Sequence, residues 1–530
     1  MPSNLKNYQM KKILLTILSV ACITSSYAGG LLTNTNQSAH FLRNPARGAS
    51  TEIDAVYTNP AGLAFLKNDG LQFSLNNQSA FQTRTITSTF PPFEGNGGNA
   101  TKEFKGTAEA PFIPSLLAAY KTGDWVFSGA FAIVGGGGTL TFKDGLPSFE
   151  SQVAMLPSML TANKIPTSQY SLESQLEGSS MTFGVQLGAT YKINDMFSAY
   201  VGGRVSIVNN GYNGYIRNIQ ANIGGGNMTN VNQYFTAAAL KANGAANSLQ
   251  SIVDGGAGGA TLNQLMAMNP QFTQDNINEL AAALGQPANV VGNLSVNYVQ
   301  AALNTLAETA TDVAAQTADK NIDVKQSGWG ITPILGLNFN WEKLNVGVKY
   351  EFITKINLEN DTKINTSGVA DFDNGVETPY DTPALLAIGA QYDVCESVTI
   401  SAGYHHFFDS NAKMANNKQK YINGGMNEFL LGAEWRINET FLISAGGQLS
   451  RTGVTDNYQS DLSYSLNSYS IGFGGAINVT EKVRINLAYL WTNYEDWTKK
   501  SENYNNTTLP GTDVFARTNN AFAIGVDFRF

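Results

Sequence analysis

Apolar side chains alternate strictly with small, polar or charged ones at the end of the chain. Every second position from Phe522 to Phe530 is apolar, and the positions between are Ala, Gly, Asp and Arg. A period of two is that of a β-strand whose two faces meet different surroundings. The same alternation recurs over 483–491, 398–404 and 182–191. We therefore predict an all-β protein.

The first 28 residues have the pattern of a secretory signal peptide. Lysines precede an uncharged apolar run over 13–23, and a small-x-small cleavage site ends at Ala28. We expect residues 1–28 to be removed, so that the mature protein begins near Gly29. A lipoprotein signal is the alternative, because Cys22 follows a small residue.

Composition favours a membrane wall built from strands. No later stretch reaches the roughly 18–20 uncharged apolar residues that a membrane helix needs. Charged residues make up 14% of the chain and aromatic ones 11%, whereas soluble domains carry about 25% charged residues. The chain has 33 Lys and Arg against 41 Asp and Glu, and the signal holds three of the lysines and no acid, so the mature net charge is −11. This charge argues against a nucleic-acid partner.

Fourteen segments carry strand patterns, an even number as single-chain bacterial barrels require. Short turns and long polar loops alternate between them, and aromatic residues stand beside the short turns, as an interfacial girdle would. The pattern predicts a transmembrane antiparallel β-barrel of about 14 strands over residues 70–530, in the bacterial outer membrane. The expected strands are 70–87, 110–121, 125–142, 179–192, 197–210, 328–341, 344–358, 383–393, 397–408, 426–436, 441–452, 467–478, 483–495 and 519–530, and the girdle residues are Trp125, Phe197, Trp341, Tyr392, Trp435 and Phe441.

The longest loop, 211–327, has a helical pattern of its own. Apolar residues recur at helical spacing, which predicts a partly helical external cap; they are Val296, Val299, Leu303, Leu306, Ala310 and Val313. A disordered surface loop is the alternative, because glycines cluster at 224–226 and 255–259.

Residues 29–69 precede the first strand and do not alternate. They contain two Asn-Pro-Ala turns, at Asn44 and at Asn59, Pro60 and Ala61. Proline is barred from strand interiors, so these residues suggest a compact irregular unit. Having no apparent core of its own, this unit is expected to act as a plug, or hatch, inside the barrel.

The chain resembles the outer-membrane long-chain fatty acid transporter family, the FadL type. The resemblance rests on the tripeptide Asn59, Pro60 and Ala61 before the first strand, on the fourteen strands, on a large third external loop and on the C-terminal aromatic residue. It implies passive uptake of a hydrophobic ligand, either a long-chain fatty acid or an aromatic hydrocarbon. It also implies capture among the external loops, lateral release into outer-membrane lipid through a kink in the third strand, and insertion by the barrel assembly machinery.

The third strand contains a candidate for that kink. Its alternation is interrupted by Gly135, Gly136, Gly137 and Gly138, which lack side chains to fill the wall and permit bulge geometry. The alternative is simple glycine enrichment, because other strands also carry paired glycines.

Two cations are candidates for holding a ligand carboxylate. Arg204 and Lys349 face the lumen by strand parity and lie several residues above their turns. In a lumen, however, charged side chains are generally paired with one another or with a plug. That pairing is the alternative for both.

Other functions have weaker support in the sequence. Catalysis or a metal site is not expected, because the histidines are His40, in the plug segment, and the adjacent His405 and His406, which point to opposite faces of a strand. No cofactor is implied. A general diffusion porin would need an open channel, and an energy-coupled receptor would need about 22 strands. A structural or adhesive barrel remains an alternative.

Overall fold

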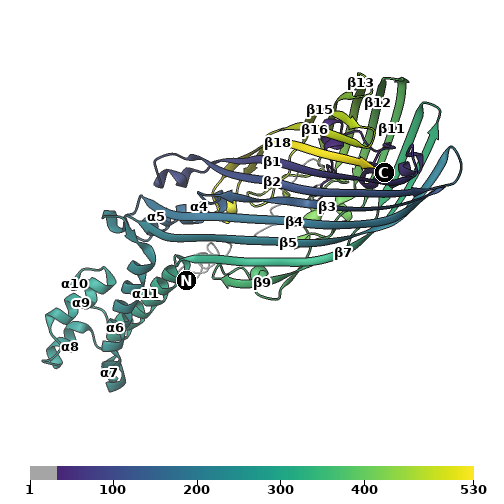
Figure 1. Cartoon of the computed structure of the whole chain (residues 1–530). Coiled ribbons are helices and arrows are strands. Elements are labelled where there is room, and N and C mark those ends of the chain that lie inside the picture. The colour runs from purple at the N-terminus through teal and green to yellow at the C-terminus, as the bar shows by residue number, and fades with distance from the viewer. Residues whose placement is uncertain (1–30, 32) are drawn as a thin grey trace.

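The protein is described from a computed structural model, which covers residue 31 and residues 33–530. The predicted signal peptide lies outside the described residues. The chain forms an elongated barrel with a helical segment projecting from one end, and the C-terminus lies at the other end (Figure 1).

Fourteen antiparallel strands of the described chain close into one wall, as the sequence predicted, with β1 pairing with both β2 and β18. Consecutive strands are neighbours around the whole barrel. Closure leaves no unpaired sheet edge in the membrane. The wall strands are β1 (Gly70–Thr89), β2 (Thr101–Thr122), β3 (Trp125–Phe142), β4 (Tyr170–Lys192), β5 (Phe197–Ala221), β7 (Lys320–Trp341), β8 (Leu344–Glu351), β11 (Leu385–Cys395), β12 (Val398–Phe407), β13 (Asn427–Arg436), β14 (Phe441–Arg451), β15 (Ser468–Thr480), β16 (Val483–Tyr494) and β18 (Gly511–Arg529).

Shorter elements lie in the plug and in the loops. Four short strands extend the wall strands in the long loops: β6 (Thr229–Asn230), β9 (Asn357–Asn365), β10 (Glu377–Pro379) and β17 (Trp497–Ser501). The described helices are α2 (Ala39–Arg43), α3 (Ala55–Thr58), η1 (Pro60–Phe65), η2 (Pro91–Gly95), α4 (Pro147–Ala154), α5 (Leu156–Ala162), η3 (Ile223–Gly225), α6 (Val231–Ser248), α7 (Gln250–Ile252), η4 (Val253–Ala257), α8 (Leu262–Met268), α9 (Gln274–Leu284), α10 (Ala288–Val291), α11 (Val296–Gln316), η5 (Ala370–Phe372), η6 (Asp409–Asn411), η7 (Ala415–Tyr421) and η8 (Tyr504–Asn506). No described helix is both long enough and apolar enough to cross a bilayer.

Several strands are longer than predicted at the end opposite the short turns. β5 continues to Ala221 and β7 already begins at Lys320, so the helical loop spans 222–319 and the predicted bounds 211–327 were too wide. β2 and β4 likewise begin about nine residues before the predicted 110 and 179. These extensions are strands because their backbones pair with those of the neighbouring strands. They lack the apolar alternation of a lipid-facing wall, which is why the sequence pattern did not include them.

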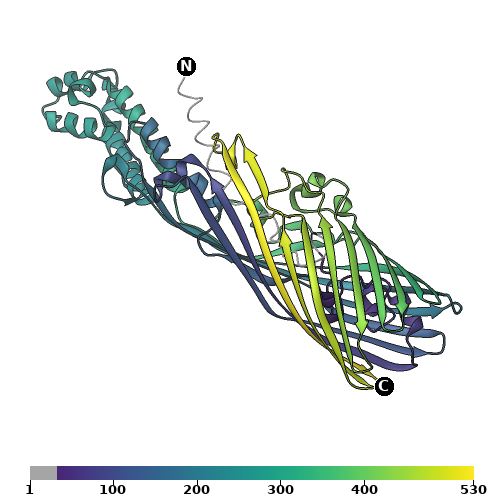
Figure 2. The ribbon, with the colours of Figure 1, turned by 90° about the horizontal axis from the view of Figure 1, so that it is seen from above.

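The helical segment has a core of its own. The interior face of α11 includes Val296, Val299 and Leu303, which are fully buried against residues of α8 and α9. Farther along α11 the buried residues are Ala307, Ala310 and Ala314, whereas the predicted Leu306 and Val313 are only partly buried. The predicted helical pattern is therefore correct, and the segment projects well beyond the barrel in both views (Figures 1 and 2).

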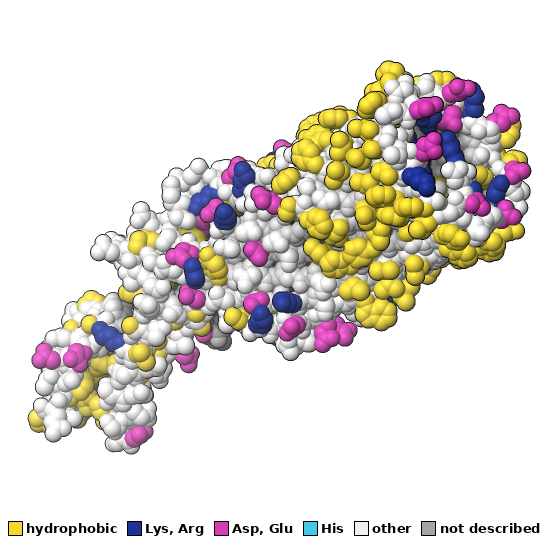
Figure 3. All heavy atoms as spheres, in the orientation of Figure 1, with side chains coloured by type: hydrophobic (Ala, Val, Ile, Leu, Met, Phe, Trp, Pro, Cys, Tyr) yellow, Lys and Arg dark blue, Asp and Glu magenta, His cyan; other side chains and the backbone are white. Residues whose placement is uncertain are grey.

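Apolar side chains cover the visible face of the barrel in the half nearer the C-terminus (Figure 3). Large side chains such as Leu187, Phe473 and Phe522 are at least half exposed. All six predicted girdle aromatics are exposed beside the short turns, from 45% for Phe197 and Tyr392 to 55% for Trp341. A closed barrel with such an apolar surface is an outer-membrane structure.

Candidate transport pathway

The plug lies inside the barrel, and its Asn-Pro-Ala motif contacts three wall strands. The Asn59 side-chain amide donates a hydrogen bond to the Leu337 carbonyl oxygen of β7 at 3.1 Å. The carbonyl oxygens of Pro60 and Ala61 accept hydrogen bonds from hydroxyls of β4 and β5, at 2.8 and 2.7 Å. Pro60 is the first residue of η1, a position whose N–H has no partner within the helix, so the N–H that proline lacks is not needed there. The motif therefore fixes the plug to this side of the wall.

Buried ion pairs hold the opposite side of the plug. Arg43 and Arg47 both pair with Glu434 of β13, and the Arg47 contact is 3.1 Å. Glu52 of the plug pairs with Arg484 of β16 at 2.6 Å. Each partner satisfies a charge that would otherwise be costly to bury.

His40, Glu52 and Asp54 form the one described cluster with metal-ligand geometry, their ligand atoms lying within 4.8 Å of one another. Both carboxylates already pair with guanidinium groups, Asp54 with Arg47 at 2.7 Å and Glu52 with Arg484. Guanidinium groups so close repel a cation, so this donor set does not fit a metal ion and instead belongs to the anchoring of the plug.

Wall glycines mark where the plug meets the strands. A Cβ atom on Gly432 would lie 1.9 Å from the Asn44 side-chain oxygen, and one on Gly472 would lie 2.0 Å from the Leu42 carbonyl oxygen. Such distances exclude any side chain at these positions. Much of the glycine enrichment in the strands thus reflects close approach of the plug.

The pairing of β2 with β3 is interrupted in the middle of the wall. Glu109 pairs with Thr139 and Leu116 with Phe131, but 110–115 of β2 and 132–138 of β3 do not pair with each other. On the lipid side of this interruption, Phe112 is 68% exposed. We call the interruption the β2–β3 gap.

Two bulges bend β3 at the gap. In its pairing with β4, β3 has an extra residue between Ile133 and Gly135 and another between Gly136 and Gly138. Gly136 and Gly137 have φ values of 65° and 129°, which L-residues rarely adopt. A Cβ on Gly136 would also lie 2.3 Å from the Ser180 carbonyl oxygen. Glycine is therefore needed at positions 136 and 137 because of the backbone conformation of the bulge.

The plug binds the backbone of β3 at the gap. The Asn34 backbone N–H donates a hydrogen bond to the Val134 carbonyl oxygen at 2.8 Å. The Asn34 side-chain amide donates to the Gly136 carbonyl oxygen, also at 2.8 Å. The Gln37 amide donates to the Ile133 carbonyl oxygen at 3.0 Å. Plug side chains thus replace the hydrogen bonds that β2 does not provide here.

The chain is similar to known proteins in its structure and not in its sequence. No protein-family model matches the chain, and no curated protein matches it in sequence. The crystal structure of a Pseudomonas aeruginosa FadL homologue matches with a TM-score of 0.56 and 11% identity, covering 94% of this chain and 99% of that one. The chain has the FadL-type fold. The toluene transporter TodX of P. putida matches with a TM-score of 0.46 and 15% identity over 91% of this chain and 95% of that one.

Arg204 and Lys349, the predicted carboxylate ligands, lie together in the lumen of the FadL-type barrel. Both pair with Glu351, at 2.8 and 2.7 Å. Lys349 also donates to the Tyr57 carbonyl oxygen of the plug at 2.9 Å, and the Arg204 guanidinium lies 4.9 Å from the Tyr57 ring centre. The structure therefore shows the charge pairing that was the alternative for both residues, because Glu351 lies between them. Their contact with a ligand stays a prediction.

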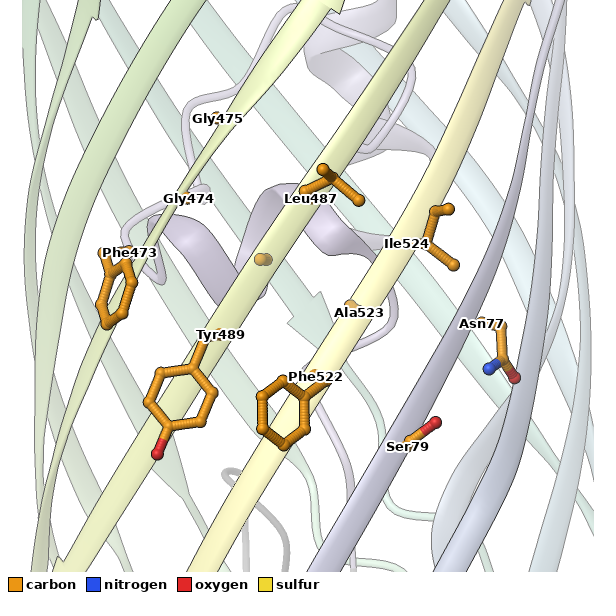
Figure 4. A pocket seen from close by; sticks show the side chains of 11 residues that line it. Asn77, Ser79, Phe473, Gly474, Gly475, Leu487, Tyr489, Phe522, Ala523 and Ile524 are labelled. Carbon is orange, nitrogen blue, oxygen red and sulfur yellow. The ribbon is translucent and has the colours of Figure 1, made fainter.

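The outer wall of the FadL-type barrel is hollowed beside the gap. A depression of about 420 Å³ lies over β15, β16, β18 and β1, with Phe522 and Tyr489 on one side and Asn77 and Ser79 on the other (Figure 4). The Asn77 side-chain oxygen accepts from the Ile113 N–H at 3.1 Å, and the Ser79 hydroxyl donates to the Pro111 carbonyl oxygen at 2.7 Å. These polar side chains satisfy the distorted backbone of β2.

β2 also contributes to the gap, which the sequence pattern did not indicate. Pro111 and Pro114 lie within this strand and have no N–H to donate to a neighbouring strand. Two prolines inside a predicted wall strand were the signal that could have located the gap on both of its sides.

Proposed function

We propose that this protein mediates passive uptake of hydrophobic small molecules across the outer membrane, with lateral release through the β2–β3 gap. The observation that supports this most is the combination of a plugged lumen with a wall whose pairing fails at one place. A plug blocks a straight water-filled path, whereas a break in the wall gives an apolar solute access to lipid. Transfer into lipid favours such a solute by roughly 0.8 kcal/mol per methylene.

Apolar side chains line the inner side of this route. Ile113 and Ile133 beside the gap belong to one buried cluster with Phe41 and Leu42 of the plug. A ligand that reaches the plug therefore meets an apolar surface continuous with the gap.

Long-chain fatty acids are the substrates we propose. The support is the resemblance carried by Asn59, Pro60 and Ala61 together with the fold. The matched TodX structure is described as that of a toluene transporter, which makes aromatic hydrocarbons the second candidate. If the ligand is a fatty acid, Arg204 and Lys349 would be the cations that bind its carboxylate, which would then replace Glu351 as their partner.

A triple deletion of Phe112, Val134 and Gly137 tests lateral release. Val134 and Gly137 are the two extra residues of β3 opposite β4. Phe112 is the extra residue of β2 opposite β1, so that after the deletions five residues face five across the gap. The register then becomes continuous with both neighbours of each strand, while the inward and outward positions of the remaining residues are kept. Valine substitutions of the glycines would be less clean, because Gly136 and Gly137 have positive φ angles.

Uptake of labelled oleate and leakage of a labelled sugar are measured in lipid vesicles. We expect the triple deletion to reduce oleate uptake to the rate of protein-free vesicles, while the barrel keeps its folded electrophoretic mobility. A deletion of Gly225 and Gly226 in the external loop is the matched control and should leave uptake unchanged. Undiminished oleate uptake in the folded triple-deletion protein would refute lateral release, and sugar leakage through the parent protein would indicate a porin.

A further inference from the structure

A polar pocket opens among the external loops. It has a volume of about 270 Å³ and is formed by the α4 helix, η7, the loop over 457–462 and η8. These four segments belong to loops between different strand pairs, all at the end opposite the short turns. A second cavity of about 210 Å³ adjoins it. The two cavities share Ser460, Asp461, Asn505 and Asn506 as lining residues.

The lining consists mainly of groups that both donate and accept hydrogen bonds. Amide side chains come from Gln152, Asn416, Asn457, Asn505 and Asn506. Carboxamides and hydroxyls match ligands whose own groups are hydroxyls, since each can serve as donor and acceptor. The pocket has one lysine, Lys418, and one aspartate, Asp461, in its lining, so it shows no preference for ligand charge.

One buried polar atom at the pocket lacks a partner within the described part of the chain, namely the Gln152 side-chain carbonyl oxygen. Gln152 as a whole is 1% exposed, and its amide donates to the Asn505 carbonyl oxygen. A buried acceptor without a partner is costly, and a ligand hydroxyl would satisfy it.

An aromatic ring and a fixed backbone complete the pocket. Tyr421 contributes a half-buried ring to the lining, and an aromatic ring of this kind can pack on the C–H face of a sugar ring. Asn416, Asn505 and Asn506 have φ values of 56°, 47° and 62°. Non-glycine residues held in this left-handed region are concentrated at binding sites.

We propose that this external pocket binds an uncharged carbohydrate, with the adjoining cavity accepting a second sugar unit. An acyl chain would leave the carboxamide groups unsatisfied, and an anionic ligand would meet Asp461 as well as Lys418. The lining of the pocket includes no residue of the plug or of the β2–β3 gap, and it is polar, whereas the surface between plug and gap is apolar.

Saturation-transfer NMR tests this with four probes: the methyl glycosides of glucose, galactose and mannose, and N-acetylglucosamine. The full-length mature protein is kept in a detergent without a sugar headgroup, because maltosides would compete. At least one probe should bind saturably. Asn457→Ala and Asn506→Ala should each weaken its binding about tenfold, since each removes one hydrogen-bonding group from the lining. Neither side chain makes a described hydrogen bond, so folding is preserved.

Asn227→Ala, an exposed asparagine in the helical loop, is the matched control and should not change binding. Repeating the titration in membranes that contain lipopolysaccharide distinguishes two natural sources of the sugar. If the probe binds more weakly there, the glycan of the membrane competes for the pocket and is its ligand. If probe binding is unchanged, the ligand is a free saccharide. Absence of saturable binding by all four probes would overturn the proposal. So would sugar binding that both pocket substitutions leave unchanged, or displacement of the sugar by octanoate.

Discussion

Replacing Glu434 with Gln removes the carboxylate that anchors two plug arginines to the wall. Arg43 and Arg47 have exposed side-chain fractions of 0% and 4%, and that of Glu434 is 12%. The interaction is therefore shielded from water, unlike a surface ion pair. The isosteric amide keeps the shape of the site and removes only the negative charge.

The expected cost is about 3 kcal/mol, at the lower end of the roughly 3–5 kcal/mol for leaving a buried charge without its partner. The lower end applies because Arg47 keeps Glu52 and Asp54, and Arg43 keeps its 2.7 Å hydrogen bond to the Ser444 hydroxyl. About 3 kcal/mol corresponds to roughly a hundredfold larger population of undocked plug.

Amide hydrogen exchange measures this population directly. Plug amides over 39–58 should exchange roughly a hundredfold faster in Glu434→Gln, while those of α11 stay unchanged. The control is Glu173→Gln, which breaks the exposed 3.0 Å pair with Arg217, whose partners are both 49% exposed. An exposed pair of this kind contributes little to stability, so that change should leave the exchange of the plug amides unaltered. Plug exchange within threefold of the parent protein would show that Glu434 does not anchor the plug.

Three further changes have defined outcomes. Gly432→Ala should displace the plug, because its Cβ would meet the Asn44 side-chain oxygen at 1.9 Å; a sugar-leakage assay in vesicles reports this, and an intact seal would contradict it. Burial raises the pKa of Asp409 in the external loop to about 7. Because the folded pKa exceeds the unfolded one, this loop should be most stable below pH about 4 and lose stability as the pH rises toward 7. Asp409→Asn should remove that dependence from the exchange of the Met426 amide, whose N–H donates to Asp409 at 2.8 Å, after correction for intrinsic rates. Leu303→Ala, at a fully buried position of α11, should destabilise the helical segment by about 2–5 kcal/mol; the helical circular-dichroism signal should melt at a lower temperature while the strand signal does not, and a common shift of both would contradict independent folding.

The strand positions within the membrane could be predicted because lipid imposes a pattern on them. Alternation over Phe522 to Phe530 marks the lipid-facing side chains of β18, and that strand does pair with β1 to close the barrel. Outside the membrane the outer face is no longer apolar. The first residues of β4, from Tyr170 onward, are therefore strands only by virtue of their pairing with β5, and the sequence pattern missed them.

The sequence predicted a plug at Asn59, Pro60 and Ala61 and an irregularity at Gly135 to Gly138, because proline and glycine restrict or free the backbone locally. It could not show that Glu351 lies between Arg204 and Lys349, which come from β5 and β8. Contacts between distant strands depend on barrel register, which no single segment encodes.

By itself, the sequence determined the backbone type and the membrane-facing pattern, since side-chain alternation and conformational freedom are properties of local segments. Only the tertiary structure decided where the pairing of the wall is interrupted, how the plug is held and which loops form the external pocket. The short turn at 123–124 already places β2 beside β3, but closure of the barrel around the plug is what brings Asn34 against the bent backbone of β3.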